Sequence, residues 1–164
     1  MHVSKTMTSP VGELTLVASA TGLAAILWQQ DRPGRVKLDI VAQDDTHPVL
    51  RETERQLNQY FAGTRTHFEL PLDFTGTDFQ KKVWAALLTI PFGETRSYAQ
   101  IAAQVGSPRA VRAVGAANSR NPVSIVAPCH RVIGSNGSLT GFAGGLDAKS
   151  ILLELEKPRA ARAA

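Results

Sequence analysis

The sequence predicts a two-domain protein: an α/β domain over residues 1–74, with a small sheet and one helix, and a mainly α domain over residues 75–164 with a helix-turn-helix. Three observations lead to this prediction. Strand-like apolar runs and one amphipathic helical segment fill the first third of the chain. Turn-forming residues at 71–76 then mark a boundary. Helix-start signals and a tight glycine turn follow it.

Two strands are expected near the N-terminus. Residues 13–19 alternate around Leu14 and Leu16, and residues 22–28 form a second apolar run. Thr21-Gly22 is typical of a turn, so the two strands should form a hairpin. Asp-Arg-Pro-Gly at 31–34 indicates a loop, and the stretch from there to Asp45 carries no clear pattern.

One helix completes the first domain. From Pro48 onward, a set of side chains falls on one helical face, and Gly63 ends the pattern. The members of this face are Leu50, Thr53, Leu57, Tyr60 and Phe61.

The second domain opens with capping boxes, in which a Ser or Thr is followed three residues later by Glu or Gln. Thr77-Asp78-Phe79-Gln80 predicts a helix that reaches Ile90 and ends at Pro91-Phe92-Gly93. Ser97-Tyr98-Ala99-Gln100 predicts a short helix that Gly106 closes. Ser107-Pro108 then has the cap and the first-turn proline that open another helix. Two short helices joined by a glycine-containing turn indicate a helix-turn-helix.

Three further elements are expected after the helix-turn-helix. Val123 to Ala127 resembles a short buried strand, entered through Asn121-Pro122 and left at Pro128. Asn136-Gly137 predicts a tight turn. Residues 147–156 form a final helix, and the tail after Lys157 is expected to fray.

The composition indicates a soluble protein of a reducing cytoplasm. Of 164 residues, 43 % are hydrophobic and 20 % are charged, an ordinary globular balance. No apolar run approaches the ~20 residues of a membrane-spanning helix, and no signal-peptide core follows the first residues. One cysteine can form neither an internal disulfide nor a zinc-binding cysteine cluster. The net charge of +4 suits a polyanionic partner, and several arginines lie between Arg96 and Arg131.

The single cysteine, Cys129, is the first candidate for chemistry. A lone cysteine is most often a buried, inert side chain. Cys129 stands between Pro128 and His130, near Arg131, and a nearby histidine or cation lowers the pKa of a thiol from its usual ~8.5. Adjacent side chains of an extended chain point to opposite faces. Cys129 and His130 therefore need a turn or a bridging water to act together.

Glu156 is a second candidate because of its place on the last helix. At 3.6 residues per turn it lies about 40° from Leu152, on the buried side, whereas Glu154 lies about 200° away. A buried carboxylate needs a partner. Spacing alone favours an arginine salt bridge or the fraying helix end, and a Cys-His-Glu relay is the functional alternative.

The second helix of the helix-turn-helix is built almost entirely of small residues from Ala110 to Ala117. Only Arg109 and Arg112 are long enough there to reach base edges. Small residues suit close approach to a minor groove with one inserted side chain, or else tight packing on the core. A glycine-rich loop at 141–145 lacks the Gly-Lys-Ser/Thr ending of a phosphate-binding loop, so nucleoside triphosphate binding is rejected.

Taken together, these segments resemble the O6-alkylguanine-DNA alkyltransferase family (methylated-DNA–protein-cysteine methyltransferases). The resemblance rests on Pro128-Cys129-His130-Arg131-Val132. Four further matches are in the family's order and spacing, and Tyr98 after Gly93-Glu94-Thr95 fits as well. These matches are Arg112–Ala117, Asn121-Pro122, Gly144-Gly145-Leu146 and Leu152–Glu156. The resemblance covers the second domain firmly and the first only loosely.

The resemblance implies a catalytic set of four residues. Cys129 is the expected alkyl acceptor, His130 its base through a water, and Glu156 the group that orients His130. Asn121 is the expected hinge between the helix-turn-helix and the active-site segment. No metal and no organic cofactor is implied. Some members bind zinc in the first domain, which this chain, with its single cysteine, is expected not to do.

The resemblance also implies how DNA is held. Arg112 would fill the gap left by a flipped nucleotide, and Tyr98 would press on the adjoining phosphate and hydrogen-bond the flipped base. Two sets of smaller contacts complete the implied site: backbone groups of Cys129, Val132 and Ala143 at the guanine edges, and phosphate contacts by Ser107 and Ser135. Some members carry Tyr and Ser where this chain has Phe142 and Ala143, so a hydroxyl contact there would be lost.

The resemblance implies a ribonuclease-H-like first domain and a winged-helix-like second domain. The implied activity is irreversible, stoichiometric transfer of the alkyl group from O6-alkylguanine, and from O4-alkylthymine, to Cys129 after base flipping. The implied partner is double-stranded DNA approached from the minor-groove side, bound by a monomer, with cooperativity along DNA left open. A sensor that binds alkylated DNA without repair would lack the cysteine. A cysteine hydrolase would not explain Arg112, and a plain transcription factor would leave the Cys-His-Glu set idle.

Overall fold

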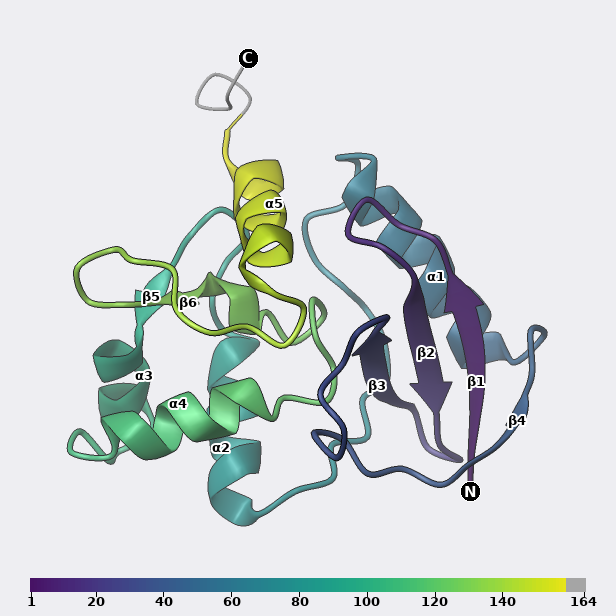
Figure 1. Cartoon of the computed structure of the whole chain (residues 1–164), viewed down its shortest axis with the longest axis horizontal. Coiled ribbons are helices and arrows are strands. Elements are labelled where there is room, and N and C mark those ends of the chain that lie inside the picture. The colour runs from purple at the N-terminus through teal and green to yellow at the C-terminus, as the bar shows by residue number, and fades with distance from the viewer. Residues whose placement is uncertain (159–164) are drawn as a thin grey trace.

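The structure is a computed structural model that describes residues 1–158 (Figure 1). Four strands form one sheet: β1 (His2–Met7), β2 (Leu14–Ala18), β3 (Leu23–Trp28) and β4 (Ile40–Gln43). Their order is β3-β2-β1-β4, with antiparallel pairing from β1 to β3 and parallel pairing of β4 with β1. The predicted hairpin is confirmed as β2 and β3. Strands β1 and β4 were not predicted.

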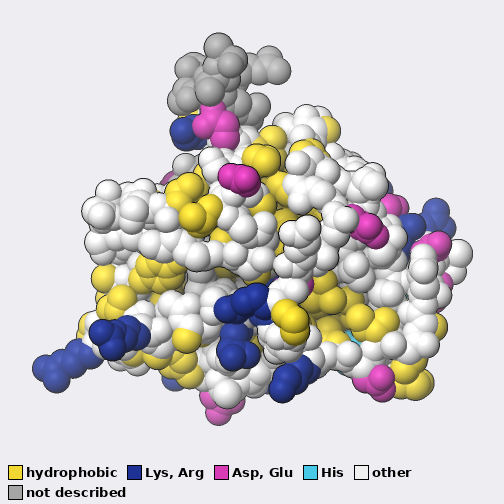
Figure 2. Space-filling view, viewed as in Figure 1, with side chains coloured by type: hydrophobic (Ala, Val, Ile, Leu, Met, Phe, Trp, Pro, Cys, Tyr) yellow, Lys and Arg dark blue, Asp and Glu magenta, His cyan; other side chains and the backbone are white. Residues whose placement is uncertain are grey.

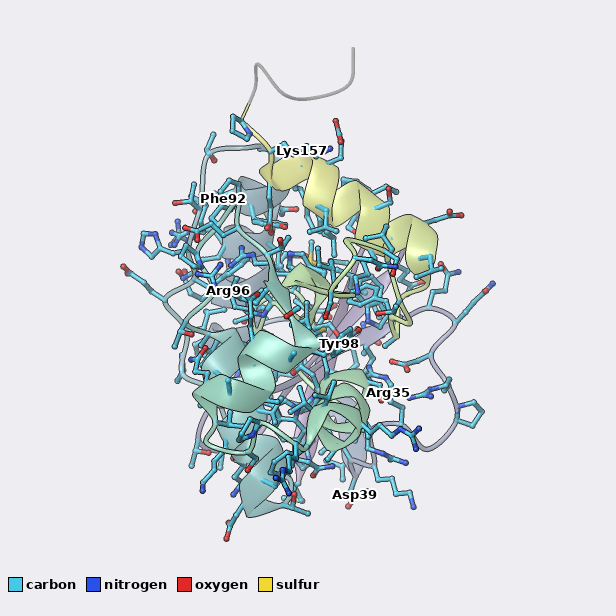
Figure 3. All side chains as sticks on the ribbon, turned by 90° about the vertical axis from the view of Figure 1, so that its left-hand side faces the viewer. Arg35, Asp39, Phe92, Arg96, Tyr98 and Lys157 are labelled. Atoms are coloured by element: carbon cyan, nitrogen blue, oxygen red, sulfur yellow. The ribbon has the colours of Figure 1, made fainter. Side chains whose placement is uncertain are left out.

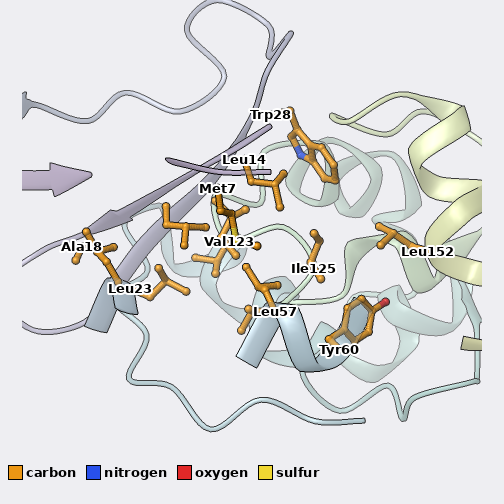
Figure 4. Packing of buried hydrophobic residues seen from close by; sticks show 14 of the residues in the cluster. Met7, Leu14, Ala18, Leu23, Trp28, Leu57, Tyr60, Val123, Ile125 and Leu152 are labelled. Atoms are coloured by element: carbon orange, nitrogen blue, oxygen red, sulfur yellow. The ribbon is translucent and has the colours of Figure 1, made fainter. Parts of the chain in front are cut away.

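Helix α1 (Pro48–Phe61) covers one face of the sheet, as the sequence predicts. Pro48 occupies the first turn, His47 caps it through its ring nitrogen, and Gly63 (φ 79°) follows its end. Its buried side packs in a cluster that also takes in residues of the second domain (Figure 4). This shared core includes Leu14, Leu23, Leu57, Tyr60, Val123, Ile125 and Leu152.

The predicted boundary segment lies along the free edge of β3. The Leu23 amide donates to the Pro71 carbonyl at 2.7 Å, and the Asp73 amide donates to the Leu23 carbonyl at 2.8 Å. A Cβ on Gly22 would lie 2.6 Å from the Pro71 carbonyl oxygen, so the close approach of the two backbones requires glycine.

The second domain contains helices α2 (Asp78–Leu87), α3 (Tyr98–Gln104) and α4 (Val111–Ser119) around a second apolar cluster (Figure 1). Both predicted capping boxes are present, at Thr77 and at Ser97. The Trp84 indole N–H donates to the Ala117 carbonyl at 2.8 Å and ties α2 to α4. Helix α2 ends at Leu87, short of the predicted Ile90, although Ile90 is buried.

The prediction that Ser107-Pro108 opens a helix is wrong. Helix α4 begins at Val111, and its N-cap, Ala110, provides no side-chain hydrogen bond. The Ser107 amide bonds the Ala102 carbonyl and so finishes α3, while the Ala110 amide donates to the Ser107 carbonyl at 2.8 Å. The proline therefore stands in a separate turn between the helices.

The predicted strand over Val123–Ala127 is also wrong. Only Val123 makes a bridge, to Ile26, and the chain then coils through local bonds. Ile125 has a φ of 73°, a left-handed conformation that is unusual for a β-branched residue. The run is apolar because it fills the shared core. Its backbone is satisfied in part by Asn121, whose amide donates to the Ala127 carbonyl and whose oxygen accepts from the Val123 amide.

The remaining elements are short strands β5 (Arg96–Ser97) and β6 (Val132–Ile133), which pair in parallel, and helix α5 (Leu146–Glu156). The turn at Asn136-Gly137 is confirmed by the Gly137 φ of 84° and its amide bond to Gly134. Helix α5 confirms the final predicted helix. Residues 159–164 of the predicted frayed tail lie outside the described residues. No helix within residues 1–158 is long and apolar enough to cross a membrane.

Candidate active site

Cys129 lies in a single 3-10 turn, Cys129–Arg131, and not in an extended segment. Its amide donates to the Ala127 carbonyl at 2.8 Å, and its side chain is 2 % exposed. The turn places Cys129 and His130 next to each other on a tightly curved backbone. From the sequence, Cys129 and His130 could act together only through a turn or a bridging water, and the turn is present.

Glu156, at the end of α5, is the anchor of this turn. Its Oε2 lies 2.6 Å from His130 Nε2, and its Oε1 accepts from Arg131 Nε at 2.7 Å. Arg131 Nη2 donates to Oε2 at 3.0 Å, and the Tyr60 hydroxyl donates to the same oxygen at 2.5 Å. The arginine salt bridge and the histidine contact, which the sequence offered as alternatives, are therefore both present.

His130 is held as a neutral imidazole. It is fully buried, and burial lowers its pKa, while the hydrogen bond and charge of Glu156 act in the opposite direction. Burial alone would raise the pKa of Glu156, but hydrogen bonds and charges from His130 and Arg131 outweigh it and hold that pKa at about 2. An ionised carboxylate only accepts, so His130 Nε2 carries the proton. Its Nδ1 has no hydrogen-bond partner within residues 1–158.

Cys129 is a protonated thiol at rest. Burial raises its pKa, against hydrogen bonds from Asn121 and Ser124 and the positive charges of Arg35 and Lys149. A thiol of this kind needs a base before it can act as a nucleophile. In the same turn, the neutral His130 can accept a proton, whereas Arg131 is already protonated.

Arg35, which the sequence analysis missed, connects the first domain to the segment before Cys129. Its Nη1 donates to the Asn121 carbonyl at 2.7 Å, and its other nitrogens bind Asp31 at 2.5 and 2.6 Å. The Trp28 indole N–H donates to Ser124 Oγ at 3.1 Å nearby. Asn121, predicted as a hinge, is thus fixed from both domains. The local pair with Asp31 does not reveal the contact that joins the domains, because Asn121 lies 86 residues away from Arg35.

Lys149 was also missed, although the sequence carried a signal for it. It is fully buried, and its Nζ donates to the Val132 carbonyl at 2.7 Å and to the Thr140 carbonyl at 3.1 Å. Lys149 precedes Leu152 by three residues and Glu156 by seven, so helical spacing places it on the same buried face. A lysine there needs backbone acceptors.

A groove of about 500 Å³ lies between α3, α4 and the glycine-rich loop. Tyr98 stands at the start of α3 in this region (Figure 3), and its hydroxyl is 2.7 Å from Thr140 Oγ1 in the loop. Tyr98 and Phe142 line the groove and also pack on the cluster that contains Cys129. The other lining residues are Arg32, Val111, Gly115, Ser119, Thr140, Gly141 and Ala143. Of the predicted base contacts, Tyr98 and Ala143 line the groove, whereas Val132 is buried and does not line it.

The predicted DNA contacts lie on the outside of the same region. Arg112 is exposed on α4, Ser107 is partly exposed in the turn before it, and Ser135 is exposed in the loop after β6. None of the three lines the groove. Basic side chains spread over this face from the edge of the helices toward its centre (Figure 2). Over residues 1–158, no three His, Cys, Asp or Glu side chains gather in a way that could hold a metal ion.

Comparisons with known proteins agree with the two-domain fold. Residues 3–74 match the family model of the 6-O-methylguanine DNA methyltransferase ribonuclease-like domain, and residues 78–158 match that of its DNA binding domain. A methylated-DNA–protein-cysteine methyltransferase of Mycobacterium tuberculosis is 50 % identical over 163 residues, which cover 95 % of this chain and 93 % of the relative. One from Methanosarcina barkeri is 49 % identical over 150 residues, covering 91 % and 93 %.

Solved structures agree as well. The O6-methylguanine methyltransferase of Mycobacterium tuberculosis superposes with a TM-score of 0.84 at 49 % identity, covering 100 % of this chain and 96 % of that one. A structure of the Mycobacterium tuberculosis protein in complex with DNA gives a TM-score of 0.82 at 48 % identity, with 94 % and 92 % coverage. Both domains and nearly the whole length are matched, so the chain belongs to the methylated-DNA–protein-cysteine methyltransferase family.

Proposed function

We propose that this protein repairs double-stranded DNA by moving the alkyl group of O6-alkylguanine, and of O4-alkylthymine, onto Cys129, once per molecule. One observation carries the proposal: His130, in the same turn as Cys129, is fixed at Nε2 by Glu156, and its Nδ1 meets no partner among the described residues, 1–158. A buried thiol beside a neutral, oriented imidazole is the arrangement of an activated cysteine nucleophile. The family relationship supports DNA as the substrate.

The first step is deprotonation of the thiol. The proton of Cys129 passes through a bridging water to His130 Nδ1, and Glu156 stabilises the imidazolium that forms. Because Nε2 is bonded to Glu156, Nδ1 is the ring nitrogen left to accept this proton. The cations of Arg35 and Lys149 favour the thiolate against the effect of burial.

The second step is displacement at the alkyl carbon. The Cys129 sulfur attacks that carbon, an S–C bond forms, and the bond from the carbon to O6 breaks. Guanine leaves with the electron pair and takes up the proton that the thiol released, by way of His130 or the Tyr98 hydroxyl. The product is a thioether, which cellular thiols do not reverse, so each molecule repairs one lesion. No metal or organic cofactor takes part in these steps.

The damaged base must leave the helix to meet the sulfur, at a cost of a few kcal/mol. The groove between α3, α4 and the glycine-rich loop is the proposed receptor for the flipped base, because Tyr98 and Phe142 line it and also pack on the cluster that contains Cys129. Tyr98 is its proposed stacking and hydrogen-bonding surface. The Val132 carbonyl already accepts from Lys149, and its second lone pair is available for a guanine amine. Ala143 offers its backbone only, since it has no hydroxyl.

The helix-turn-helix of α3 and α4 is the proposed DNA-reading unit, and the protein is proposed to act as a monomer from the minor-groove side. The small residues of α4 let its backbone approach a narrow groove, and exposed Arg112 would fill the gap in the base stack. Ser107 and Ser135 are proposed phosphate contacts, and Asn121 is the proposed hinge between α4 and the active-site turn. Lys and Arg side chains gather toward the lower left and centre of the face in Figure 2, which supports binding to a polyanion there.

The test is intact-protein mass after incubation with a duplex that contains one O6-methylguanine, followed by a peptide map. We expect one added methyl group per protein, on Cys129, and none on the Cys129→Ala protein, which should still bind the duplex. Transfer by Cys129→Ala would refute the mechanism. No mass gain by the wild type, together with tight binding, would indicate a sensor of alkylated DNA. The same experiment with a duplex that contains one O4-methylthymine tests the second proposed substrate.

A further inference from the structure

The first domain contributes a side chain to the candidate active site. Tyr60 stands in the last turn of α1 and is 1 % exposed, yet its hydroxyl donates to Glu156 Oε2, a residue 96 positions later. The same carboxylate oxygen lies 2.6 Å from His130 Nε2. Figure 4 shows the Tyr60 ring within the shared core, with its hydroxyl on the side of the second domain.

We propose that Tyr60 is a positioning residue that sets the proton affinity of His130 by sharing Glu156 Oε2 with it. Each hydrogen bond that a carboxylate accepts reduces the negative charge left for another donor. A less basic Glu156 stabilises the imidazolium less, so His130 stays neutral and able to accept the thiol proton. This inference rests on the proposed function, in which His130 is the base.

The charged and titratable side chains that face Glu156 and His130 have all been described above. Arg131 and Tyr60 face Glu156 together with His130, and Lys149 and Arg131 add positive charge near His130. Arg131 is fixed in turn by the Ile90 carbonyl at 2.6 Å. Of the three residues that hydrogen-bond the Glu156 carboxylate within residues 1–158, Arg131 is charged and His130 takes up a proton in the proposed reaction, whereas Tyr60 does neither, so its removal changes hydrogen bonding without changing the net charge of the site.

The position of the hydroxyl is fixed by packing. The Tyr60 ring contacts Phe61, Phe68 and Phe92, with ring centroids 5.3, 5.5 and 6.3 Å away. Burial, followed by the negative charge of Glu156, raises the pKa of Tyr60 above its ordinary value of 10.0, so the hydroxyl remains protonated and a donor between pH 5 and 9. Phenylalanine would keep these ring contacts. A purely structural role for Tyr60 and a role through its hydroxyl therefore predict different results for Tyr60→Phe.

The experiment measures the rate of methyl transfer from an O6-methylguanine duplex between pH 5 and 9 for wild type and Tyr60→Phe. Loss of the hydroxyl leaves more charge on Glu156 for His130, which raises the pKa of His130. We expect the apparent pKa of the acid limb of the profile to rise by roughly half a pH unit to one pH unit in Tyr60→Phe. The plateau rate should stay within about threefold of wild type. Thr53→Val is the matched control, because it removes another buried hydroxyl of α1 that bonds the Val49 carbonyl and not Glu156.

Two further measurements keep the inference testable on its own. Titration of the His130 ring by NMR, without DNA, should show the same upward shift in Tyr60→Phe. 3-Fluorotyrosine at position 60 has nearly the same shape and is a stronger hydrogen-bond donor, so it should lower the pKa of His130. This substitution provides the test if Tyr60→Phe does not fold. Coincident wild-type and Tyr60→Phe profiles, or an equal shift in Thr53→Val, would overturn the role of Tyr60. Absence of transfer by wild type would overturn the proposed function instead, and the NMR shifts would still report the coupling.

Discussion

Replacing Glu156 by glutamine should destabilise the protein by an amount that depends on pH. The side chain is 2 % exposed and its carboxylate neutralises buried Arg131, so the amide leaves a buried guanidinium without its counter-charge. A fall in the pKa of Glu156 from 4.5 to about 2 corresponds to about 3 kcal/mol at pH 7, at about 1.4 kcal/mol per unit. Breaking a buried ion pair by removing one partner typically costs about 3–5 kcal/mol, which agrees.

The sign of the pH dependence follows from the direction of this pKa. A carboxyl whose pKa is depressed by folding stabilises the folded state fully above its unfolded-state pKa, here 4.5. That contribution disappears as the pH falls toward the folded-state pKa of about 2, because the folded protein then binds the proton too. Glutamine does not titrate. The difference in unfolding free energy between wild type and Glu156→Gln should therefore be constant above pH 5 and shrink steadily below it.

Urea unfolding at pH 7, 5, 4 and 3, followed by the fluorescence of buried Trp28 and Trp84, measures this difference. Glu52→Gln is the matched control. Its carboxyl also has a pKa lowered to about 2, through hydrogen bonds to Arg55 and Gln56, but the pair is largely exposed. Water and salt screen such a pair, so its loss should change stability far less. A Glu156→Gln effect below about 1 kcal/mol at pH 7, or one equally large at pH 3 and pH 7, would refute the reasoning.

Two other substitutions test the DNA face and the glycine-rich loop. Arg112→Ala should weaken binding to a duplex containing O6-methylguanine more than it slows reaction with the free base, as measured by gel shift and by mass; equal losses would argue against an inserted side chain. Gly144→Ala places a Cβ 2.7 Å from the Trp28 ring, so it should lower the free energy of unfolding, measured by thermal unfolding, by about 1–3 kcal/mol. Gly141→Ala, whose Cβ would meet nothing within 4 Å, should cost much less, and an equal loss would refute the packing argument.

The elements that could be predicted from the sequence are those with local signals. The capping boxes at Thr77 and Ser97 place both helix starts correctly, because each uses a side chain within three residues of the backbone it satisfies. The helix at 48–61 and the last helix are revealed by periodic apolar faces. Strands β1 and β4 have no comparable pattern: β1 is only partly buried along most of its length, and β4 is exposed throughout.

The two wrong predictions share a physical cause. Ser107-Pro108 and Val123–Ala127 both have suitable residues for the predicted element, but the backbone of each segment bonds to a neighbouring structure instead. The Ser107 amide completes α3, and the Ala127 carbonyl accepts from the Asn121 side chain. An apolar run next to a buried asparagine can be a coiled core segment as readily as a strand, since the amide of the asparagine substitutes for a strand partner.

The fate of Glu156 shows why the site could be predicted only in part. Helical spacing placed it on the buried face, and that placement is confirmed, but spacing offered an arginine pair and a histidine relay as alternatives. A carboxylate has two oxygens with about four lone-pair sites, and here they serve His130, Arg131 and Tyr60 at once. The arginine keeps the carboxylate ionised, which in the proposed mechanism makes Glu156 a useful partner for a histidine that becomes positively charged. A salt bridge that looked like a competing, merely structural explanation is therefore a condition for the relay, and the hydroxyl from the first domain reaches it only because the two domains share one core.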